Sequence, residues 1–486
     1  MIVWSNKKIV FMQIRIGIAF IFLSFQLSFS QTDSLEVFQD EIVIDTIVTD
    51  SIEDFGYKSE IINANAISNF YTKLKQLENK KDCKLRIVHI GDSHIQADLF
   101  SGKMRTLLQE RFGNGGLGFT FPYNLAKTNG NYFIKYSAST SFDCSRNVFA
   151  DSTKPVGLSG ISMETKAKDF AIELQVRDNQ YKFNTIKVVS PQNQKLIDLA
   201  TASNEIKIES ATPKVIYHKI KSGEALSIIA DKYKVSINAI KKANGLYSNN
   251  IRAGKVLKIP TNETEPKIVS RKEFMPLTLN QNANSYSYYS PTELDKIYIL
   301  PAENSNNFTL NGIVLEKNTS GIVYSNIGVN GAKASDYNKF PLFFEQLKTL
   351  EADLVVISLG TNESFDKLET QTYFERLNQM ISTIKSKNPL VEILITTPPP
   401  SLWKRKYPNT LVEEYTQKII ENALTEKYAV WNMFDALGGL KNVNKNYAKG
   451  LLSKDKVHYS KAGYEKQGTL FFEALLNTYE QVKSNE

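Results

Sequence analysis

The apolar residues in the first part of the chain alternate between helical and strand patterns. A continuous apolar run at 85–90 has the length of a buried strand. It lies between two segments with apolar residues at helical spacing, one through Ile67, Phe70, Leu74 and Leu77 and the other through Met104, Leu107, Leu108 and Phe112. The second helix should end at the glycine-rich run 113–116.

From about 125 to 214 the period of the pattern changes to two. Residues 170–176 and 185–189 are alternating stretches separated by polar turns, which is typical of strands. The same pattern returns from about 265 to 319, for example at 296–300. These stretches predict an all-β region, interrupted by a compact segment of different character at about 215–260.

Alternation of strands and helices resumes after residue 320. Strand-like runs are expected at 321–326, 354–359, 391–396 and 429–434, a helix through Tyr373, Leu377, Met380 and Ile384, and a closing helix at 461–482. Continuous apolar strands are typical of a parallel sheet that is covered on both faces. We therefore predict an open, mostly parallel α/β sheet with its chemistry at the carboxyl edge, into which the β region is inserted.

The N-terminal segment has the features of a secretory signal. Lys7, Lys8 and Arg15 precede an apolar stretch at 16–29, and Ser28-Phe29-Ser30 forms a small-x-small cleavage pattern. An uncleaved anchor is the alternative, although the apolar stretch is short for a membrane span. Residues 31 to about 60 are acidic and predict a flexible leader, within which 43–48 could pair as a strand.

Charge and cysteine content narrow the function classes. Subtracting the three cations of the signal from the formal charge of +8 leaves +5, with no basic run or aromatic-basic stripe of the kind that binds nucleic acid. Later apolar runs are only strand-length, so no integral membrane segment is expected after signal removal. Cys83 and Cys144 could form a disulfide in an exported protein or remain two buried thiols. No metal-ligand spacing and no cofactor motif is found.

Residues that could carry chemistry follow the predicted strands. Gly91-Asp92-Ser93-His94 ends the first strand, and a serine hydroxyl needs a base that a third group holds in place. Of the four histidines, His89 lies within a strand and His218 in the compact segment, which leaves His458, with Asp455 three residues before it, as the best base. His94 adjoins the serine and could either touch substrate or be structural.

Four segments together resemble the four blocks of the SGNH (GDSL-like) hydrolase superfamily. They are Gly91-Asp92-Ser93-His94, Asn326 to Ala332, Gly360-Thr361-Asn362-Glu363 and Asp455-Lys456-Val457-His458. The resemblance implies that Ser93 is the nucleophile, His458 the general base and Asp455 its orienting partner. It also implies an oxyanion hole made of the Ser93 and Gly331 backbone N–H groups and the Asn362 side-chain amide. The family often has aspartate after the block-three asparagine, where this chain has Glu363.

The compact segment at 217–260 resembles a LysM module, a β-α-α-β fold that binds N-acetylglucosamine-containing glycans. Its binding loops would lie at about Ser222 to Ala225 and Asn249 to Ile251, with Ser222, Gly223, Glu224, Ala225, Asn249 and Ile251 as candidate contacts. A module that serves only as a spacer is the alternative. The surrounding β region resembles the carbohydrate-binding-type jelly roll of peptidoglycan O-acetylesterases. Two further stretches, 89–98 leading into 111–119 and 311–316 leading into 327–332, resemble the same subfamily.

The expected fold is an SGNH-type (flavodoxin-like) mostly parallel sheet with helices on both faces, interrupted by an all-β jelly-roll-like insertion with a nested LysM module. The expected boundaries are a signal peptide at 1–30, an acidic leader at 31–65, hydrolase parts at 66–124 and 320–486, β-insertion parts at 125–214 and 261–319, and LysM at 215–260.

The expected function is that of an exported, periplasmic or cell-envelope serine esterase that removes O-acetyl groups from peptidoglycan, with no cofactor. An O-acetyltransferase, an esterase for another polysaccharide and a non-catalytic wall-binding protein remain alternatives. Oligomeric state is not readable from the sequence.

Overall fold

The computed structural model describes residues 60–149, 153–204, 206, 208, 212–265 and 269–484. The expected signal peptide at 1–30, most of the acidic leader and the possible strand at 43–48 lie outside these residues. In the described part, no helix is long and apolar enough to cross a membrane.

A six-stranded sheet organises the α/β part of the chain, and every strand pair in it is parallel. Its order is β2-β18-β1-β19-β20-β23, where β1 is Lys84–Gly91, β2 Asn114–Gly116, β18 Gly321–Gly328, β19 Leu354–Ser358, β20 Glu392–Thr396 and β23 Ala429–Trp431. Apart from the short edge strand β2, the strands follow the 2-1-3-4-5 order of flavodoxin-like sheets. The predicted α/β class with a parallel sheet is confirmed.

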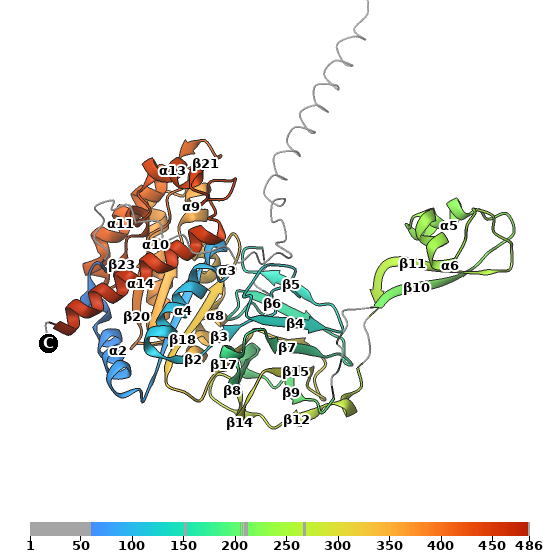
Figure 1. Cartoon of the computed structure of the whole chain (residues 1–486), viewed down its shortest axis with the longest axis horizontal. Coiled ribbons are helices and arrows are strands. Elements are labelled where there is room, and N and C mark those ends of the chain that lie inside the picture. Colours follow the sequence, from blue (N-terminus) through green and yellow to red (C-terminus); the bar gives the residue numbers. More distant parts are fainter. Residues whose placement is uncertain are drawn as a thin grey trace, which may run out of the picture. The chain divides into compact units, whose positions relative to one another are not determined.

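Helices cover both faces of this sheet (Figure 1). Leu85 and Ile87 of β1 belong to one core with α2 Ser68–Lys80, α4 Phe100–Phe112, α12 Met433–Ala436, α13 Val443–Ala448 and α14 Lys461–Ser484. Val88 and Ile90 belong to the other core with α7 Ala334–Asn338, α8 Pro341–Leu347, α10 Thr370–Lys387 and α11 Thr410–Glu426. Because successive side chains of a strand point to opposite faces, a continuous apolar run fills both cores.

The inserted region is built of antiparallel sheets, in agreement with its two-residue period. One five-stranded sheet contains β12 Met275–Leu277, β9 Ile197–Thr201, β15 Lys296–Pro301, β7 Ile172–Val176 and β4 Ile134–Ala138. A second contains β13 Asn280–Gln281, β14 Tyr286–Leu294, β8 Phe183–Val189, β17 Gly312–Glu316 and β3 Gly118–Thr120, and a three-stranded sheet contains β16 Phe308–Thr309, β6 Ile161–Thr165 and β5 Asp143–Arg146. Their apolar side chains are continuous with the core beneath α8 and α10.

Residues 118–120 form β3 and pair with β17 of the antiparallel sheet, with Gly116 and Gly118 at φ +129° and +84°. One local expectation needs correction. The expected strand at 429–434 ends at Trp431, because the Asn432 side chain accepts a hydrogen bond from the Asp435 N–H and so begins α12.

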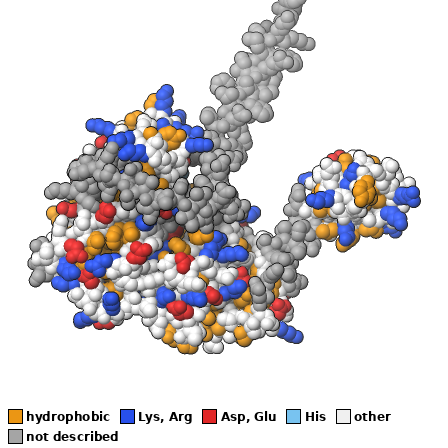
Figure 2. Space-filling view, in the orientation of Figure 1, with side chains coloured by type: hydrophobic (Ala, Val, Ile, Leu, Met, Phe, Trp, Pro, Cys, Tyr) orange, Lys and Arg blue, Asp and Glu red, His pale blue; other side chains and the backbone are white. Residues whose placement is uncertain are grey.

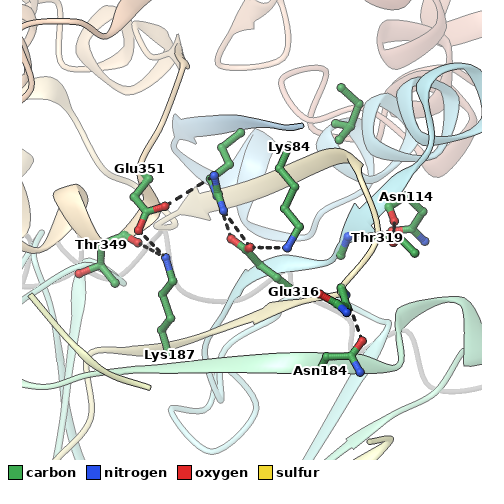
Figure 3. A network of polar contacts seen from close by, with 12 residues as sticks. Lys84, Asn114, Asn184, Lys187, Glu316, Thr319, Thr349 and Glu351 are labelled. Carbon is green, nitrogen blue, oxygen red and sulfur yellow. Dashed lines mark hydrogen bonds and ion pairs between the residues drawn. The ribbon is translucent and has the colours of Figure 1, made fainter. Parts of the chain in front are cut away.

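A polar network ties the insertion to the amino end of the parallel sheet (Figure 3). Glu316, at the end of β17, accepts hydrogen bonds from Lys84 Nζ at 3.0 Å and from Arg86 Nε at 2.9 Å. Lys187 of β8 reaches Glu351 at 2.8 Å, and Glu351 lies 3.6 Å from Arg86. Burial opposes the charge on Glu316, but the hydrogen bonds and charges of Arg86 and Lys84 prevail and lower its pKa to about 2.

The LysM segment has a small core of its own. Strands β10 Thr212–Lys219 and β11 Val256–Glu265 form a two-stranded antiparallel sheet, and helices α5 Leu226–Tyr233 and α6 Ile237–Asn244 lie between them in the chain. Buried side chains of all four elements or their ends, including Ile229, Ile240 and Ile259, form one cluster. The predicted β-α-α-β order is confirmed.

Candidate active site

The carboxyl ends of three parallel strands meet at one edge of the sheet. Gly91 at the end of β1 is paired with Gly328 at the end of β18 and with Ser358 at the end of β19. Ser93, Gly331 and Asn362 each follow one of these ends within a few residues. The register of these parallel strands therefore brings three of the predicted site residues to the same edge, as expected for an open α/β sheet.

Ser93 begins a short helical turn, α3 Ser93–Gln96. The Asp92 side chain caps this turn, because its Oδ1 accepts the His94 N–H at 2.9 Å. The turn lies so close to the strand end that a Cβ on Gly91 would come within 2.4 Å of Ile95 Cγ1 and 2.8 Å of the Ser358 carbonyl. Glycine is therefore required for the sharp exit of β1 that leaves Ser93 half-buried at the sheet edge.

Ser93, His458 and Asp455 form one hydrogen-bonded relay. Ser93 Oγ lies 2.9 Å from His458 Nε2, although the two residues are 365 positions apart. His458 Nδ1 lies 2.7 Å from Asp455 Oδ2, and Asp455 Oδ1 accepts the backbone N–H groups of Val457 and His458 at 2.9 and 3.0 Å. The network assigns the neutral histidine a proton on Nδ1 and leaves Nε2 free to accept from the serine.

The charges of this relay favour a basic imidazole. Burial lowers the pKa of His458, but the hydrogen bond and charge of Asp455, with a contribution from Asp92, outweigh burial and raise it above 6.5. Burial likewise opposes ionisation of Asp455, and the hydrogen bond and charge of His458 with the two backbone N–H groups lower its pKa to about 2. Asp455 is therefore ionised at neutral pH and stabilises the protonated form of His458.

The Asn362 side chain is held by two acceptors. Its Nδ2 donates to Asp92 Oδ2 at 3.1 Å and to the Ala332 carbonyl at 3.0 Å. Asp92 is 1% exposed, and burial raises its pKa to about 7 against the opposing hydrogen bond from His94 and the charge of His458. Asp92 thus links the serine turn to the asparagine, a connection between residues 270 positions apart that no local pattern indicates.

The loop that carries Gly331 is fixed from three directions. Gln96 Oε1 accepts the Asn330 N–H at 2.5 Å, and its Nε2 donates to Thr128 Oγ1 at 2.7 Å. Glu363 Oε1 accepts the Ala334 N–H at 2.9 Å, and Asn362 holds the Ala332 carbonyl. Gly331 itself has φ +83°, and its N–H donates no hydrogen bond within the described part of the chain.

Gln96 and Glu363 were not identified as site residues from the sequence. Gln96 lies two residues after the serine block and Glu363 is the last residue of the third block, so closeness to these blocks was the signal that could have found them. Burial raises the pKa of Glu363 to about 7, with backbone N–H groups opposing. Through its hydrogen bond to the Ala334 N–H, this glutamate supports the loop that carries Gly331.

His94 and His89 are both buried rather than presented to solvent. His94 is 4% exposed, its Nδ1 lies 2.9 Å from Tyr464 Oη, and its ring centroid is 5.3 Å from that of His458. His89 contacts Tyr324 Oη at 2.9 Å and Ser358 Oγ at 2.6 Å. Burial lowers the pKa of each histidine to about 3, so both are neutral. Of the two roles open to His94, this placement favours the structural one over substrate contact.

The candidate glycan-binding residues of the LysM segment lie on two loops at one end of its sheet. Ser222, Gly223 and Ala225 are exposed before α5, and Asn249 is exposed before β11, with Ile251 packed partly against the core. The Ile220 N–H donates to the Lys255 carbonyl at 2.9 Å, and the Gly254 N–H donates to the Ile220 carbonyl at 2.8 Å. These two hydrogen bonds bring the two loops together. Glu224 is occupied internally, because its Oε2 accepts from Lys221 N–H at 2.7 Å and contacts His218 Nε2 at 2.8 Å.

Two further observations bear on ligands and redox chemistry. No group of three or more His, Cys, Asp or Glu side chains in the described residues is arranged to hold a metal ion. Cys83 and Cys144, for which the sequence left a disulfide open, are free thiols and partly buried.

Two protein families match segments of this chain. The GDSL-like Lipase/Acylhydrolase family matches residues 305–466, a range that includes Gly331, Asn362, Asp455 and His458 but not Ser93, and the LysM domain family matches residues 218–260. Residues of the LysM segment are 50% identical over 42 residues to "Probable peptidoglycan endopeptidase LytE" of Bacillus subtilis (strain 168), which is 9% of this chain and 13% of that protein.

Among solved structures, the chain resembles a peptidoglycan O-acetylesterase, with TM-score 0.59 and 19% identity over 86% of this chain and 99% of that chain. A lipase/acylhydrolase from Enterococcus faecalis matches 32% of this chain and 77% of its own length, with 23% identity and TM-score 0.26. The first likeness shows a shared fold across both the α/β part and the insertion. The chain therefore carries an enzyme domain of the GDSL-like lipase/acylhydrolase type, a hydrolase of esters, together with a LysM domain.

Proposed function

We propose that this protein is an exported serine esterase that removes O-acetyl groups from cell-wall peptidoglycan. The observation that carries the proposal is the hydrogen-bonded relay of Ser93, His458 and Asp455 at the carboxyl edge of the sheet, with distances of 2.9 and 2.7 Å. The LysM domain and the fold shared with a peptidoglycan O-acetylesterase support the choice of substrate.

In the first half-reaction, Ser93 Oγ attacks the acetyl carbonyl carbon while its proton moves to His458 Nε2. Asp455 stabilises the imidazolium that forms and holds its ring through Nδ1–H. The tetrahedral intermediate then expels the sugar oxygen, which takes the proton from His458, and an acetyl-serine remains.

The developing oxyanion would be bound by N–H donors from three strand ends. The backbone N–H of Ser93 starts a helical turn and has no acceptor within that turn, and the Gly331 N–H likewise donates to no group in the described residues. Asn362 supplies the third donor by sharing one of the amide hydrogens that Asp92 and Ala332 now accept. Each such donor can contribute roughly 10²–10³ in rate.

In the second half-reaction, His458 deprotonates a water molecule, which attacks the acetyl-serine and releases acetate. A sugar hydroxyl in place of water would make the same site an O-acetyltransferase. The structure offers no observation that favours transfer, and both reactions share the acyl-enzyme.

The LysM domain and the β-rich insertion would keep the active site near glycan. We propose glycan contacts at Ser222 to Ala225, Asn249 and Ile251, with Glu224 acting as a support for its loop through His218 rather than as a ligand. The antiparallel sheets would form a jelly-roll-like glycan-binding insertion. One weakly binding module raises the local concentration of substrate without high affinity, which suits a protein exported to the cell envelope.

Acetate release from O-acetylated peptidoglycan by the full chain and by its Ser93→Ala variant tests this function. We expect release by the wild type and none above background by the variant. Chitooligosaccharide in the same reaction separates the alternatives, since efficient acetyl transfer with negligible hydrolysis would overturn the esterase assignment. Equal, negligible rates of wild type and variant on an activated acetate ester would indicate a non-catalytic wall-binding protein.

A further inference from the structure

A short hairpin lies directly beside the loop that carries Asp455 and His458. Its strands are β21 Leu402–Trp403 and β22 Tyr407–Pro408. The Leu402 N–H donates to the Lys456 carbonyl at 3.0 Å, and Tyr459 Oη donates to the Pro400 carbonyl at 3.1 Å. The hairpin is therefore fixed to the relay loop on both sides of His458.

Three consecutive cations form the turn of this hairpin. Lys404, Arg405 and Lys406 are exposed, and the first two have left-handed backbone, with φ +51° and +62°. Hairpin turns usually place Asn, Asp or Gly at such positions, because a longer side chain strains the backbone there. The turn therefore presents three consecutive basic side chains to solvent.

Aromatic residues flank these cations in the chain and contact them. The ammonium groups of Lys404 and Lys367 are each 4.3 Å from the centroid of the Trp403 ring, and that of Lys406 is 5.4 Å from the Tyr407 ring. The Tyr407 side chain is 51% exposed, and its ring centroid is 6.3 Å from that of Trp403. The hairpin thus combines positive charge with exposed ring surface.

These cations have no carboxylate partner in the described part of the chain. No ion pair there involves Lys367, Lys404, Arg405 or Lys406, whereas Lys333 is paired with Asp366 at 2.6 Å. Figure 2 shows basic and hydrophobic side chains gathered over the end of the molecule that carries β21 and α13 in Figure 1. Unpaired cations beside aromatic rings at the rim of an active site suit an anionic partner that also has apolar faces.

We propose that the β21–β22 hairpin binds the carboxylates of an acidic O-acetylated glycan while a sugar ring contacts Trp403 or Tyr407. This rests on the proposed function and deepens it, because it selects among acetylated polymers. Peptidoglycan carries free carboxylates on its stem peptides, whereas the backbone of an acetylated xylan is neutral. The hairpin therefore favours the acidic polymer and presents its acetyl groups to Ser93.

The test compares a hairpin variant with a matched control in the full chain. The hairpin variant is Lys404→Gln, Arg405→Gln and Lys406→Gln together, and Trp403→Ala is made separately. The control is Lys80→Gln, Lys348→Gln and Lys387→Gln, which removes the same charge from exposed residues that precede β1, β19 and β20 at the opposite edge of the sheet. None of these residues belongs to the relay or to the proposed oxyanion hole.

We expect the hairpin variant to raise KM for O-acetylated peptidoglycan about tenfold at about 50 mM salt, with less difference at about 500 mM, because salt screens exposed charges. Its kcat/KM on a small neutral acetate ester should equal that of wild type, and the control variant should match wild type on both substrates. Trp403→Ala should raise KM with little dependence on salt. An unchanged KM in the hairpin variant, or an equal rise in the control, would overturn the proposal.

Binding separates this proposal from the proposed function. Ser93→Ala protein is sedimented with peptidoglycan, with peptidoglycan whose carboxyl groups have been amidated, and with neutral chitin as a probe of LysM. If the wild type releases no acetate while the Ser93→Ala protein loses hairpin-dependent binding on amidation, the hairpin site is supported and the esterase is refuted. If the wild type releases acetate but binding changes neither on amidation nor in the hairpin variant, the esterase is supported and the hairpin site is refuted. Tighter hairpin-dependent binding to anionic phospholipid vesicles than to peptidoglycan would also refute the glycan site.

Discussion

Replacement of Asp455 by Asn tests the electrostatics of the relay. In the native protein Asp455 Oδ2 accepts from His458 Nδ1 at 2.7 Å, and its charge raises the pKa of His458. Asn can still accept one hydrogen bond but carries no charge, and its amide can instead donate to Nδ1. The Asp455→Asn variant therefore loses the stabilised imidazolium and part of the population with the correct tautomer.

The size of the effect follows from the pKa of the carboxylate. Interaction with His458 and with two backbone N–H groups lowers the pKa of Asp455 from 3.8 to about 2 against the cost of burial, a gap of about 2.4 kcal/mol. The side chain is 28% exposed, so we reduce this to about 1–2 kcal/mol for solvent screening. That alone slows the reaction roughly 5- to 30-fold. With loss of the correct tautomer we expect kcat/KM to fall about 10²- to 10⁴-fold.

The pH dependence of activity provides a second test, because it should shift toward lower pH while the maximal rate falls. The general base must be neutral, so activity should rise with pH through the pKa of His458, which lies above 6.5 in the native protein. Without the Asp455 charge, burial dominates and the pKa of His458 falls. The acidic limb of the variant should therefore move to lower pH even as its plateau drops.

Hydrolysis of a small acetate ester, measured as kcat/KM from about pH 4 to about pH 9, checks both signals. Asp295→Asn is a suitable control, because that carboxylate is 58% exposed in the β-rich insertion and lies 3.9 Å from Lys182. An acidic limb that stays in place or moves upward in the Asp455→Asn variant would refute the electrostatic reasoning. So would an equal loss of activity in the control.

Three further substitutions have defined outcomes. Asp92→Asn leaves one acceptor oxygen for the two N–H groups, of His94 and Asn362, that donate to Asp92 in the native protein. Steady-state kinetics should therefore show kcat lower by about 5- to 100-fold with KM nearly constant. An unchanged kcat would show that Asn362 does not need the hydrogen bond to Asp92. Glu316→Gln should lower the unfolding free energy at pH 7 by about 2–4 kcal/mol, since it removes the carboxylate that pairs with the partly buried Lys84 and Arg86 and leaves Arg86 with Glu351 alone, at 3.6 Å. Because the folded pKa of Glu316 lies below 4.5, at about 2, its contribution is present above pH 4.5 and lost as pH falls toward 2, so denaturant titrations of variant and wild type should converge in acid. Gly91→Ala should cost about 1–3 kcal/mol in thermal unfolding and a larger share of activity, and a variant with native activity would contradict the close approach of α3 to β1.

Much of the fold could be predicted from the sequence because the spacing of apolar residues is clearly helical in some segments and clearly strand-like in others. The apolar runs of β1, β19 and β20 fill two cores, and a run of this length and composition is typical of a strand that is covered on both faces. Ser93 and Asn362 could be placed at strand ends for the same reason, since parallel strands bring their carboxyl ends to one edge. Asp455 and His458 were found by residue type and spacing on one loop.

Other features depend on contacts that no local pattern encodes. The hydrogen bond from Asn362 to Asp92 and that from Asn330 to Gln96 join residues 270 and 234 positions apart. The hairpin at Trp403 has strands of two residues each, which is too short to produce a period. The burial of His94 follows from Tyr464 of the last helix, which the sequence places 370 residues away.

Pairing of β3 with β17 has a consequence for the order of folding. The central strand β1 must pair with β18, yet the insertion separates them, so that Arg86 of β1 and its partner Val323 of β18 lie on opposite sides of the insertion in the chain. Closure of so long a loop is entropically costly, and contacts between distant residues slow folding. Once Phe119 and Val314 are paired, the ends of the insertion lie side by side and the remaining loop to β18 is only a few residues long. The insertion is therefore expected to fold first. By bringing its two ends together, it would allow β1 and β18 to pair and the serine site to form.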